Sequence, residues 1–260
     1  LKDAVLPKLK MSAVTSSAVA AWRDRRLKQV SGATVNREID VLSAVFNHAR
    51  REWDVHVENP IPLIKRPDKA RARDRRFSAE EERYLLAALT GGERLADGTF
   101  SKGARNPWLL PLVKLAIETA MRRGELLSLS WEHVDLVRQT AHLPDTKNGD
   151  PRTVPLSTRA VAILKALPTP EADEDFEGEK EVQRSGAVFP TTALALRKGF
   201  ARAIERAQEQ YRADCKQAKR RPVPGFLEDV HFHDTRHEAA SRLAEKLTNV
   251  LELSAVTGHK

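Results

Sequence analysis

Cysteine, long apolar runs and targeting signals are scarce or absent in this chain of 260 residues, and each absence excludes a class of protein. Cys215 is the only cysteine, which excludes an intramolecular disulfide, fits a reducing cytoplasm and predicts an incidental surface thiol. No apolar run approaches the length of a membrane span, and no signal-peptide pattern opens the chain. The composition is 41% hydrophobic and 31% charged, which is typical of a soluble globular protein large enough for two domains.

The net charge of +8 is unevenly distributed along the chain. Residues 1–76 hold 17 Lys and Arg against 9 Asp and Glu, whereas the rest of the chain holds 27 of each. A basic first part joined to a balanced second part predicts a clamp on a polyanion, most simply DNA. Deleting residues 1–76 is therefore expected to flatten the salt dependence of DNA binding. The alternative is a solvated basic surface without a partner.

Residues 1–64 are predicted to form a small helical domain. Apolar groups recur there in alternating steps of four and three, which indicates one helical stripe. They are Val35, Ile39, Leu42, Phe46, Ala49 and Trp53. Residues 18–30 predict a shorter helix, capped by Ser16 or Ser17. The charged, apolar-poor residues 65–76 have the composition of a linker.

Residues 77–260 predict a second, mixed domain, so the fold class expected for the chain is mainly α with a small β-sheet or hairpin. The domain opens with a capping box formed by Ser78 and Glu81. Helices are expected at residues 108–121, 157–167, 192–218, 234–246 and 249–256, and strands at residues 140–144, 152–156 and 187–190. Asn148 and Gly149 mark a turn between the first two of these strands.

Arg122 and Arg123 follow an apolar helix at a turn and precede Glu125. A buried arginine is costly unless it meets an anion or a carboxylate. One that is held at a helix end can present its planar guanidinium to two phosphate oxygens. On its own, the motif is equally compatible with a structural ion pair between arginine and Glu125.

The histidines at positions 231, 233 and 237 raise the question of a metal site, because His233 and His237 are four residues apart on an expected helix. Arg236 lies between them, and a cation beside a metal dication is unfavourable, so the sequence disfavours a metal. His233 and Arg236 instead share one face at the N-terminus of that helix, where free N–H groups attract phosphate.

Two further basic residues carry little information when each is considered alone. Lys147 lies in the expected hairpin turn, where most lysines are exposed and inert, although one beside a phosphate could protonate a leaving oxyanion. His259 follows Gly258 past the last expected helix. A lone histidine there is usually structural, and the glycine fits a helix stop.

The order and spacing of these motifs together resemble those of the tyrosine recombinase, or phage integrase, family over about residues 17–260. The segment around Arg122 resembles the first-arginine box of the family, with Ala120 where glycine is usual. Residues 146–149 are similar to its β-hairpin lysine segment.

The remaining motifs extend this resemblance to the end of the chain. Residues 233–237 resemble the His-x-x-Arg box, with Thr235 where leucine is usual, and Gly258 with His259 is similar to the Gly-His motif. The residues around Lys147 and Arg236 look closest to shufflon-type plasmid recombinases.

The resemblance implies a helical core-binding domain at residues 1–64, a basic linker at residues 65–76 and a mixed α/β catalytic domain at residues 77–260. The implied reaction is conservative site-specific recombination, for DNA integration, excision or inversion. A tyrosine attacks the scissile phosphate, and strands are exchanged through a 3′-phosphotyrosyl link and a Holliday junction. Bond energy is kept in the covalent link, so no cofactor, neither ATP nor metal, is implied.

The resemblance also assigns roles to five basic residues. Arg122 and Arg236 would bind the non-bridging phosphate oxygens. Lys147 would protonate the leaving 5′-oxygen. His233 would assist proton transfer from the tyrosine, and His259 would donate a hydrogen bond to the phosphate.

The nucleophile is the departure from the family pattern. The two tyrosines of the chain, Tyr84 and Tyr211, do not follow the Gly-His motif, and the family's tyrosine is expected just beyond Lys260. A truncated recombinase and a DNA-binding regulator that does not cleave both fit this pattern. A helix-turn-helix repressor that uses residues 17–53 is a third possibility.

The partners implied are a double-stranded DNA recombination site and further copies of the chain in a homotetramer, with no membrane, in the bacterial cytoplasm at the nucleoid. The cations expected to contact DNA lie on the first helix and in the linker. They are Arg23, Arg25, Arg26, Lys28, Lys69, Arg71, Arg73, Arg75 and Arg76.

Overall fold

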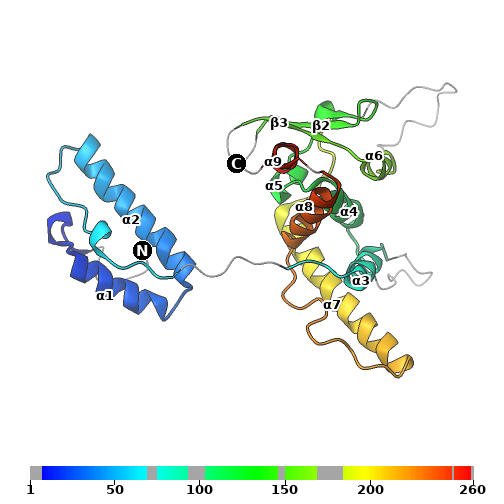
Figure 1. Cartoon of the computed structure of the whole chain (residues 1–260), viewed down its shortest axis with the longest axis horizontal. Coiled ribbons are helices and arrows are strands. Elements are labelled where there is room, and N and C mark those ends of the chain that lie inside the picture. Colours follow the sequence, from blue (N-terminus) through cyan, green and yellow to red (C-terminus); the bar gives the residue numbers. More distant parts are fainter. Residues whose placement is uncertain are drawn as a thin grey trace. The chain divides into compact units, whose positions relative to one another are not determined.

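The structure is a computed structural model, shown in Figure 1. It describes residues 8–68, 75–92, 103–145, 150–168, 184–247 and 249–258. The chain divides into two compact units, residues 1–73 and residues 74–260, and each is described by itself. Within the described ranges, no helix is both long enough and apolar enough to cross a membrane.

The first unit is built on two helices, α1 (Ser16–Leu27) and α2 (Gly32–Glu52), with short 3-10 turns at Met11–Ala13 and Ile61–Leu63. They pack through a small apolar cluster of Val19, Trp22, Val35, Ile39 and Ile61. The N-cap of α1 is Thr15, whose hydroxyl accepts from the Ala18 N–H. The prediction of Ser16 or Ser17 as the cap was therefore wrong by one or two residues. Trp53 was also misplaced: it lies just past the end of α2 and is 59% exposed.

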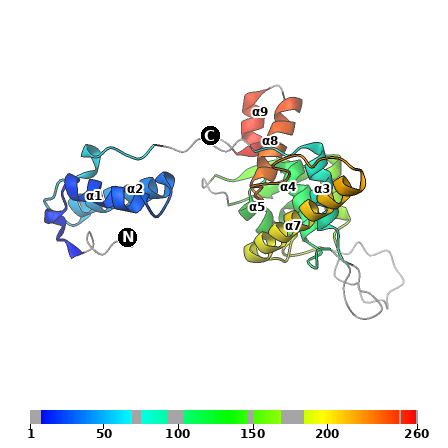
Figure 2. The same ribbon diagram turned by 90° about the horizontal axis from the view of Figure 1, so that it is seen from below.

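The second unit contains seven helices among its described residues. They are α3 (Ala79–Leu89), α4 (Leu109–Thr119), α5 (Arg123–Leu127), α6 (Thr158–Lys165), α7 (Ala193–Gln217), α8 (Asp234–Lys246) and α9 (Val250–Thr257). The capping box predicted at the start of α3 is confirmed, because Ser78 and Glu81 satisfy each other's backbone N–H groups. Figures 1 and 2 both show α3 lying alongside the long helix α7.

A small antiparallel sheet completes this unit, with strand order β1 (Val134–Asp135), β2 (Thr140–Leu143) and β3 (Arg152–Pro155). The two strands predicted around the turn are confirmed, and their register pairs Leu143 with Arg152. The two-residue strand β1, which follows a 3-10 turn at Trp131–His133, was not expected. The strand expected at residues 187–190 is reduced to an isolated bridge between Ser130 and Ala187.

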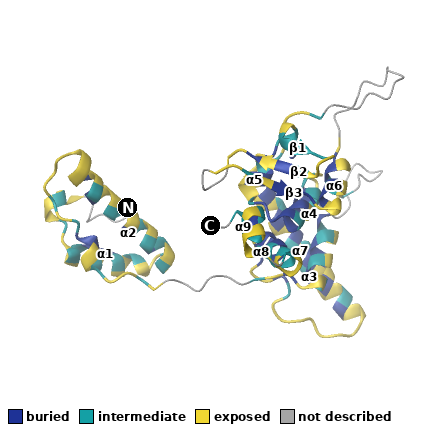
Figure 3. Cartoon of the chain, turned by 45° about the horizontal axis from the view of Figure 1, so that its top comes forward, coloured by how far each residue is buried: buried dark blue, intermediate teal, exposed yellow. Residues whose placement is uncertain are grey.

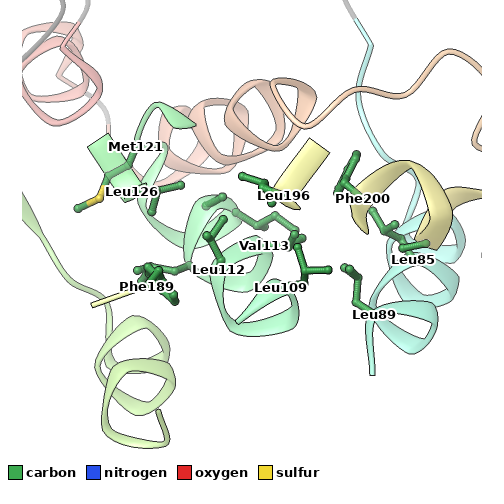
Figure 4. Packing of buried hydrophobic residues seen from close by; sticks show 14 of the residues in the cluster. Leu85, Leu89, Leu109, Leu112, Val113, Met121, Leu126, Phe189, Leu196 and Phe200 are labelled. Atoms are coloured by element: carbon green, nitrogen blue, oxygen red, sulfur yellow. The ribbon is translucent and has the colours of Figure 1, made fainter. Parts of the chain in front are cut away.

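Helix α4 lies at the centre of the core of the second unit. Figure 3 shows the buried residues gathered around α4 and the strands, and Figure 4 shows Leu109, Leu112 and Val113 of α4 among the side chains of neighbouring elements. Gly199 of α7 allows a close approach, because a Cβ at that position would lie 2.3 Å from Cδ1 of Leu109. Cys215 is fully buried in this core, so the expectation of a surface thiol was wrong.

Candidate active site

Arg122 is presented by a sharp turn between α4 and α5. Ala120 ends α4 in the left-handed region, with φ of 53°, and its side chain is fully buried. That conformation favours glycine, because an L side chain is strained there. Arg122 follows in an extended conformation, and its backbone N–H donates to Oε2 of Glu125 over 2.7 Å. The turn thus fixes the backbone position from which the Arg122 side chain extends.

The Arg122 side chain is 21% exposed and bonds to two parts of the second unit. Its Nη1 donates to Oε1 of Glu125 over 2.9 Å, and its Nη2 donates to the backbone oxygen of Gly258 over 2.9 Å. The structural ion pair considered from the sequence is therefore present. It coexists with partial exposure of the side chain, which lines an open cavity.

Arg236 reaches the same place from the first turn of α8. It is 4% exposed, and its guanidinium donates to the backbone oxygens of Ala120 and Thr257, the latter over 2.5 Å. The pKa of Arg236 is lowered to about 10, first by burial and then by the positive charges of Arg122 and Arg152. This pKa lies well below the ordinary value for arginine because Arg236 lies among cations and away from water.

Arg152 is a third arginine of this cluster and was not singled out from the sequence. Its side chain is 10% exposed; Nη2 donates to Oε2 of Glu125 over 2.7 Å, and Nη1 donates to the Thr257 oxygen over 2.9 Å. One sequence signal could have found it: Arg152 and Val154 lie two apart on β3 and so face the same side, and Val154 is fully buried.

His233 occupies the N-cap position of α8, close to the arginines. Its ring meets that of His237 edge-on, with centroids 5.0 Å apart. Although part of the side chain meets solvent, the pKa of His233 is lowered, first by desolvation and then by the nearby charges of His237 and Arg236. The neutral imidazole is thereby favoured near neutral pH, and a neutral imidazole can accept a proton.

A cavity of about 930 Å³ opens beside this cluster. It lies between α5, α7 and the segment before α8, and Arg122 and His233 are part of its lining. Leu196, Phe200 and Ile204 of α7 contribute apolar side chains to it. An anion bound at Arg122 would therefore be reachable from solvent on one side and flanked by apolar side chains on the other.

The two tyrosines of the chain lie away from this cavity and are engaged elsewhere. The hydroxyl of Tyr84 donates to Oδ2 of Asp214 over 2.7 Å. The hydroxyl of Tyr211 accepts from the Val223 N–H over 3.0 Å, and its ring stacks on Phe226 with centroids 3.6 Å apart. Neither hydroxyl is available to attack a group bound at the arginine cluster.

Comparison with known proteins identifies the family to which this geometry belongs. The model of the phage integrase family matches residues 78–260, and that of the phage integrase N-terminal domain matches residues 4–66.

The chain belongs to the phage integrase family.

Two curated relatives support this assignment. The chain is similar to a shufflon-specific DNA recombinase of Escherichia coli, at 38% identity over 96% of this chain and 56% of the relative. An integrase/recombinase of Haemophilus influenzae is 30% identical over 96% of this chain and 70% of the relative. The first match bears out the resemblance to shufflon-type recombinases. The chain spans little more than half the length of that relative.

Solved structures of phage integrase family members share the fold at low sequence identity. A lambda integrase dimer bound to a core site gives a TM-score of 0.65 at 20% identity, covering 98% of this chain and 82% of that one. The Tn1549 transposon integrase in complex with circular intermediate DNA gives 0.64 at 18% identity, covering 98% and 81%. The expected architecture, helical with a small sheet and in two domains, is thereby confirmed.

Two of the residues matched to integrase motifs, Lys147 and His259, lie outside the described residues. So do three of the cations expected to contact DNA, namely Lys69, Arg71 and Arg73. The structure therefore brings together Arg122, His233 and Arg236 of the predicted set, and adds Glu125 and Arg152 to them.

The other predicted DNA-contacting cations differ in their surroundings. Arg26 forms a double hydrogen bond with Glu38 and is 13% exposed, and Arg23 bonds to Asp24 and to the Lys65 oxygen. Arg25 and Lys28 are exposed. In the second unit, Arg75 pairs with the buried Glu81 and Arg76 with Glu238. A structural role, in addition to any contact with DNA, therefore belongs to four of these cations: Arg23, Arg26, Arg75 and Arg76.

Proposed function

We propose that the full-length protein is a tyrosine-type site-specific DNA recombinase that cleaves and rejoins strands through a 3′-phosphotyrosyl intermediate and a Holliday junction. The observation that carries the proposal is the convergence of Arg122 and Arg236 from distant parts of the chain, beside His233 and an open cavity. Three guanidinium groups around the single carboxylate of Glu125 form a site with excess positive charge. A phosphodiester supplies the missing negative charge.

Arg122 and Arg236 hold the non-bridging oxygens of the scissile phosphate in this proposal. The lowered pKa of Arg236 supports it, because a cation in such surroundings gains more from an arriving anion than one in water. As the phosphorus becomes five-coordinate, charge grows on those oxygens, and fixed donors stabilise it without reorganising.

His233 and Lys147 carry out the two proton transfers in this proposal. The attacking hydroxyl gives its proton to the neutral imidazole of His233 as the oxygen–phosphorus bond forms. Lys147 gives a proton to the 5′-oxygen as the bond to the leaving strand breaks. His259 donates a hydrogen bond to the phosphate. The nucleophile is a tyrosine that follows the Gly-His motif in the full-length protein, since Tyr84 and Tyr211 are engaged elsewhere.

The proposed partners are a double-stranded DNA recombination site and three further copies of the protein, acting at the bacterial nucleoid. The Escherichia coli relative, a shufflon-specific DNA recombinase by name, supports site-specific DNA recombination as the reaction. The assembly is supported by a lambda integrase tetramer bound to a Holliday junction, which has the same fold with a TM-score of 0.59. The first domain and the linker, including Arg25, Lys28, Lys69, Arg71 and Arg73, supply contacts to the DNA backbone.

A covalent-adduct assay tests this function directly. The full-length protein is incubated with genomic DNA of its source cell, and DNA ends that carry protein are trapped and sequenced to find the site. A duplex of that site, nicked beside the scissile phosphate, then accumulates the adduct. We expect a stable 3′-linked adduct from the parent protein and a loss of roughly 100-fold or more in Arg236→Lys. Tight DNA binding without any adduct would show a non-cleaving DNA-binding protein instead.

A further inference from the structure

Arg152 is the member of the arginine cluster to which no role has been given. It lies at the start of β3, yet its guanidinium contacts two other elements of the second unit. One nitrogen donates to Glu125 of α5, and the other donates to the Thr257 oxygen at the end of α9. Arg152 therefore links the turn that presents Arg122 to the helix end that precedes His259.

Both acceptors of Arg152 are shared with the arginines proposed to hold the phosphate. Glu125 also accepts from Arg122, and the Thr257 oxygen also accepts from Arg236. A shift of Glu125 would therefore move Arg122, and a shift of the end of α9 would move Arg236. Arg152 contacts both acceptors and therefore couples a shift of Glu125 to a shift of the end of α9.

The position of Arg152 is costly, which argues against a chance contact. Burial lowers the pKa of Arg152, and the charge of Arg122 adds to the effect. Its Nε is buried and has no hydrogen-bond partner among the described residues. Gly258 makes room for it, because a Cβ there would lie 1.8 Å from Nη1 of Arg152. The chain thus keeps a third cation beside two others at the expense of stability.

We propose that Arg152 is a positioning residue for strand cleavage, which holds Arg122 and Arg236 in register through Glu125 and the Thr257 oxygen. The inference rests on the proposed function. Arg152 does not itself meet the phosphate; it restrains the two acceptors that orient the guanidinium groups that do. Lysine cannot replace it, because one ammonium cannot reach both acceptors with the fixed fork of a guanidinium.

The test compares Arg152→Lys with the parent in the full-length protein, under single-turnover conditions at saturating nicked duplex. We expect the cleavage rate constant to fall on the order of 10–100-fold, because small misplacements of catalytic groups have effects of that size. We expect the Kd for DNA to change by less than about threefold, because the net charge is kept. The matched control is Arg138→Lys, an 85% exposed arginine in the turn between β1 and β2, which should cleave like the parent.

A second substrate separates positioning from a merely structural role. A methylphosphonate at the scissile position replaces one charged non-bridging oxygen by a methyl group, so alignment of the two arginines matters less. We expect the ratio of the cleavage rate constants of the parent and Arg152→Lys to be smaller by about fivefold or more on this substrate. A variant that is only partly folded would lose reaction amplitude equally on both substrates and keep the rate constant of its folded fraction.

Three outcomes overturn the inference. They are a cleavage rate constant for Arg152→Lys equal to that of the parent, an equal deficit on both substrates, and a loss of amplitude alone. Absence of an adduct from the parent protein is a different result: it removes the proposed function, and the positioning role falls with it. Arg152→Lys supports both the proposed function and the positioning role if it forms the same adduct as the parent, but slowly, and if its deficit shrinks on the methylphosphonate substrate.

Discussion

Gly258 shows how much one residue at the end of α9 constrains the arginine cluster. It caps the helix with φ of 66°, where any other side chain is strained, and its own oxygen accepts from Arg122. An added Cβ would collide with Nη1 of Arg152 and lie 3.3 Å from Nη1 of Arg122. The glycine of the Gly-His motif is therefore needed for space as well as for backbone conformation.

Gly258→Ala is expected to impair cleavage far more than folding. Backbone strain at such a position costs about 1–2 kcal/mol, whereas displaced arginines should slow cleavage on the order of 100-fold. The control is Gly225→Ala, which has a similar φ of 75° but no neighbour closer than 3.7 Å. Both variants should lose similar stability by denaturant unfolding, and only Gly258→Ala should lose adduct formation. Equal activity of the two would contradict the steric argument.

The protonation of His233 gives a prediction about pH. Its pKa lies below the ordinary value of 6.5, so the imidazole is neutral at pH 7 and becomes charged only as the pH falls through that lowered pKa. If the neutral form accepts the proton of the nucleophile, the cleavage rate is full at neutral pH and declines on the acid side, below pH 6.5.

His233→Asn should cleave roughly 100-fold more slowly at pH 7 and should lose this acid-side decline. Single-turnover rates measured between about pH 5 and pH 8 check both effects, over the range in which histidine titrates. His56→Asn is the control, because His56 is an exposed histidine of the first unit, with 91% of its side chain accessible. An acid-side decline that survives in His233→Asn would assign the titration to another group.

The sequence predicted the cations of this site better than their partners. Arg122, His233 and Arg236 carry recognisable motifs, and the structure brings them together. Arg152 has no motif of its own, since its importance arises from contacts with Glu125 and Thr257, which lie 27 and 105 residues away in the chain. Such long-range contacts leave only a faint pattern in a single sequence.

At the scale of elements, α3 and α7 are joined by an aromatic and polar contact. Tyr84 of α3 meets Tyr211 of α7 edge-on at 5.4 Å between centroids, and it donates to Asp214 one turn further along α7. This bond lowers the pKa of Asp214, so its contribution to stability is full above the ordinary carboxyl pKa of 3.8. It is lost as the pH falls through the lowered value.

Tyr84→Phe removes the bond while keeping the ring. We expect the melting temperature at pH 7 to fall by about 2–4 °C, and the difference from the parent to shrink in acid as Asp214 becomes protonated. Cleavage should be unchanged, because the Tyr84 hydroxyl bonds to Asp214 and does not line the cavity beside the arginine cluster. Differential scanning calorimetry and the adduct assay measure the two properties. Loss of the adduct with full stability would instead place Tyr84 in the chemistry.

The long helices and the two strands around the turn were predictable at this scale, whereas β1 and the structure of residues 187–190 were not. Helix α8 begins and ends where its pattern predicts, and Ser78 and Glu81 specify the start of α3 by local chemistry alone. Strand β1 has only two residues, too few to show an alternation, and it exists because β2 pairs with it. The apolar character of residues 187–190 favours a strand. It instead reflects the burial of Val188 and Phe189 in the core.

At the scale of the whole molecule, several of the cations behind the charge asymmetry form ion pairs within their own unit. In the first unit, Arg23, Arg26 and Arg66 pair with Asp24, Glu38 and Asp40. In the second, Arg75 and Arg76 anchor the end of the basic segment to α3 and α8. The excess of cations over carboxylates in residues 1–76 persists, however, because pairing removes equal numbers of both.

These ion pairs change which deletion tests the electrostatic clamp. Removing residues 1–76 would also remove Arg75 and Arg76, so Glu81 would lose its ion pair with Arg75, and Glu238 would keep only its ion pair with Arg242. Removing residues 1–73 keeps both pairs and still takes away most of the excess charge. Each phosphate contact that is lost should lower the slope of log Kd against log salt by about 0.9. We therefore expect the slope to fall by several units in this deletion.

Neutralising the exposed Lys28 to Gln in the full-length protein should lower the salt slope by no more than about one unit. Arg26→Gln should leave the slope nearly unchanged and lower the stability of the first unit, because that guanidinium already bonds to Glu38. A slope that the deletion leaves unchanged would show that DNA is held by the second unit alone.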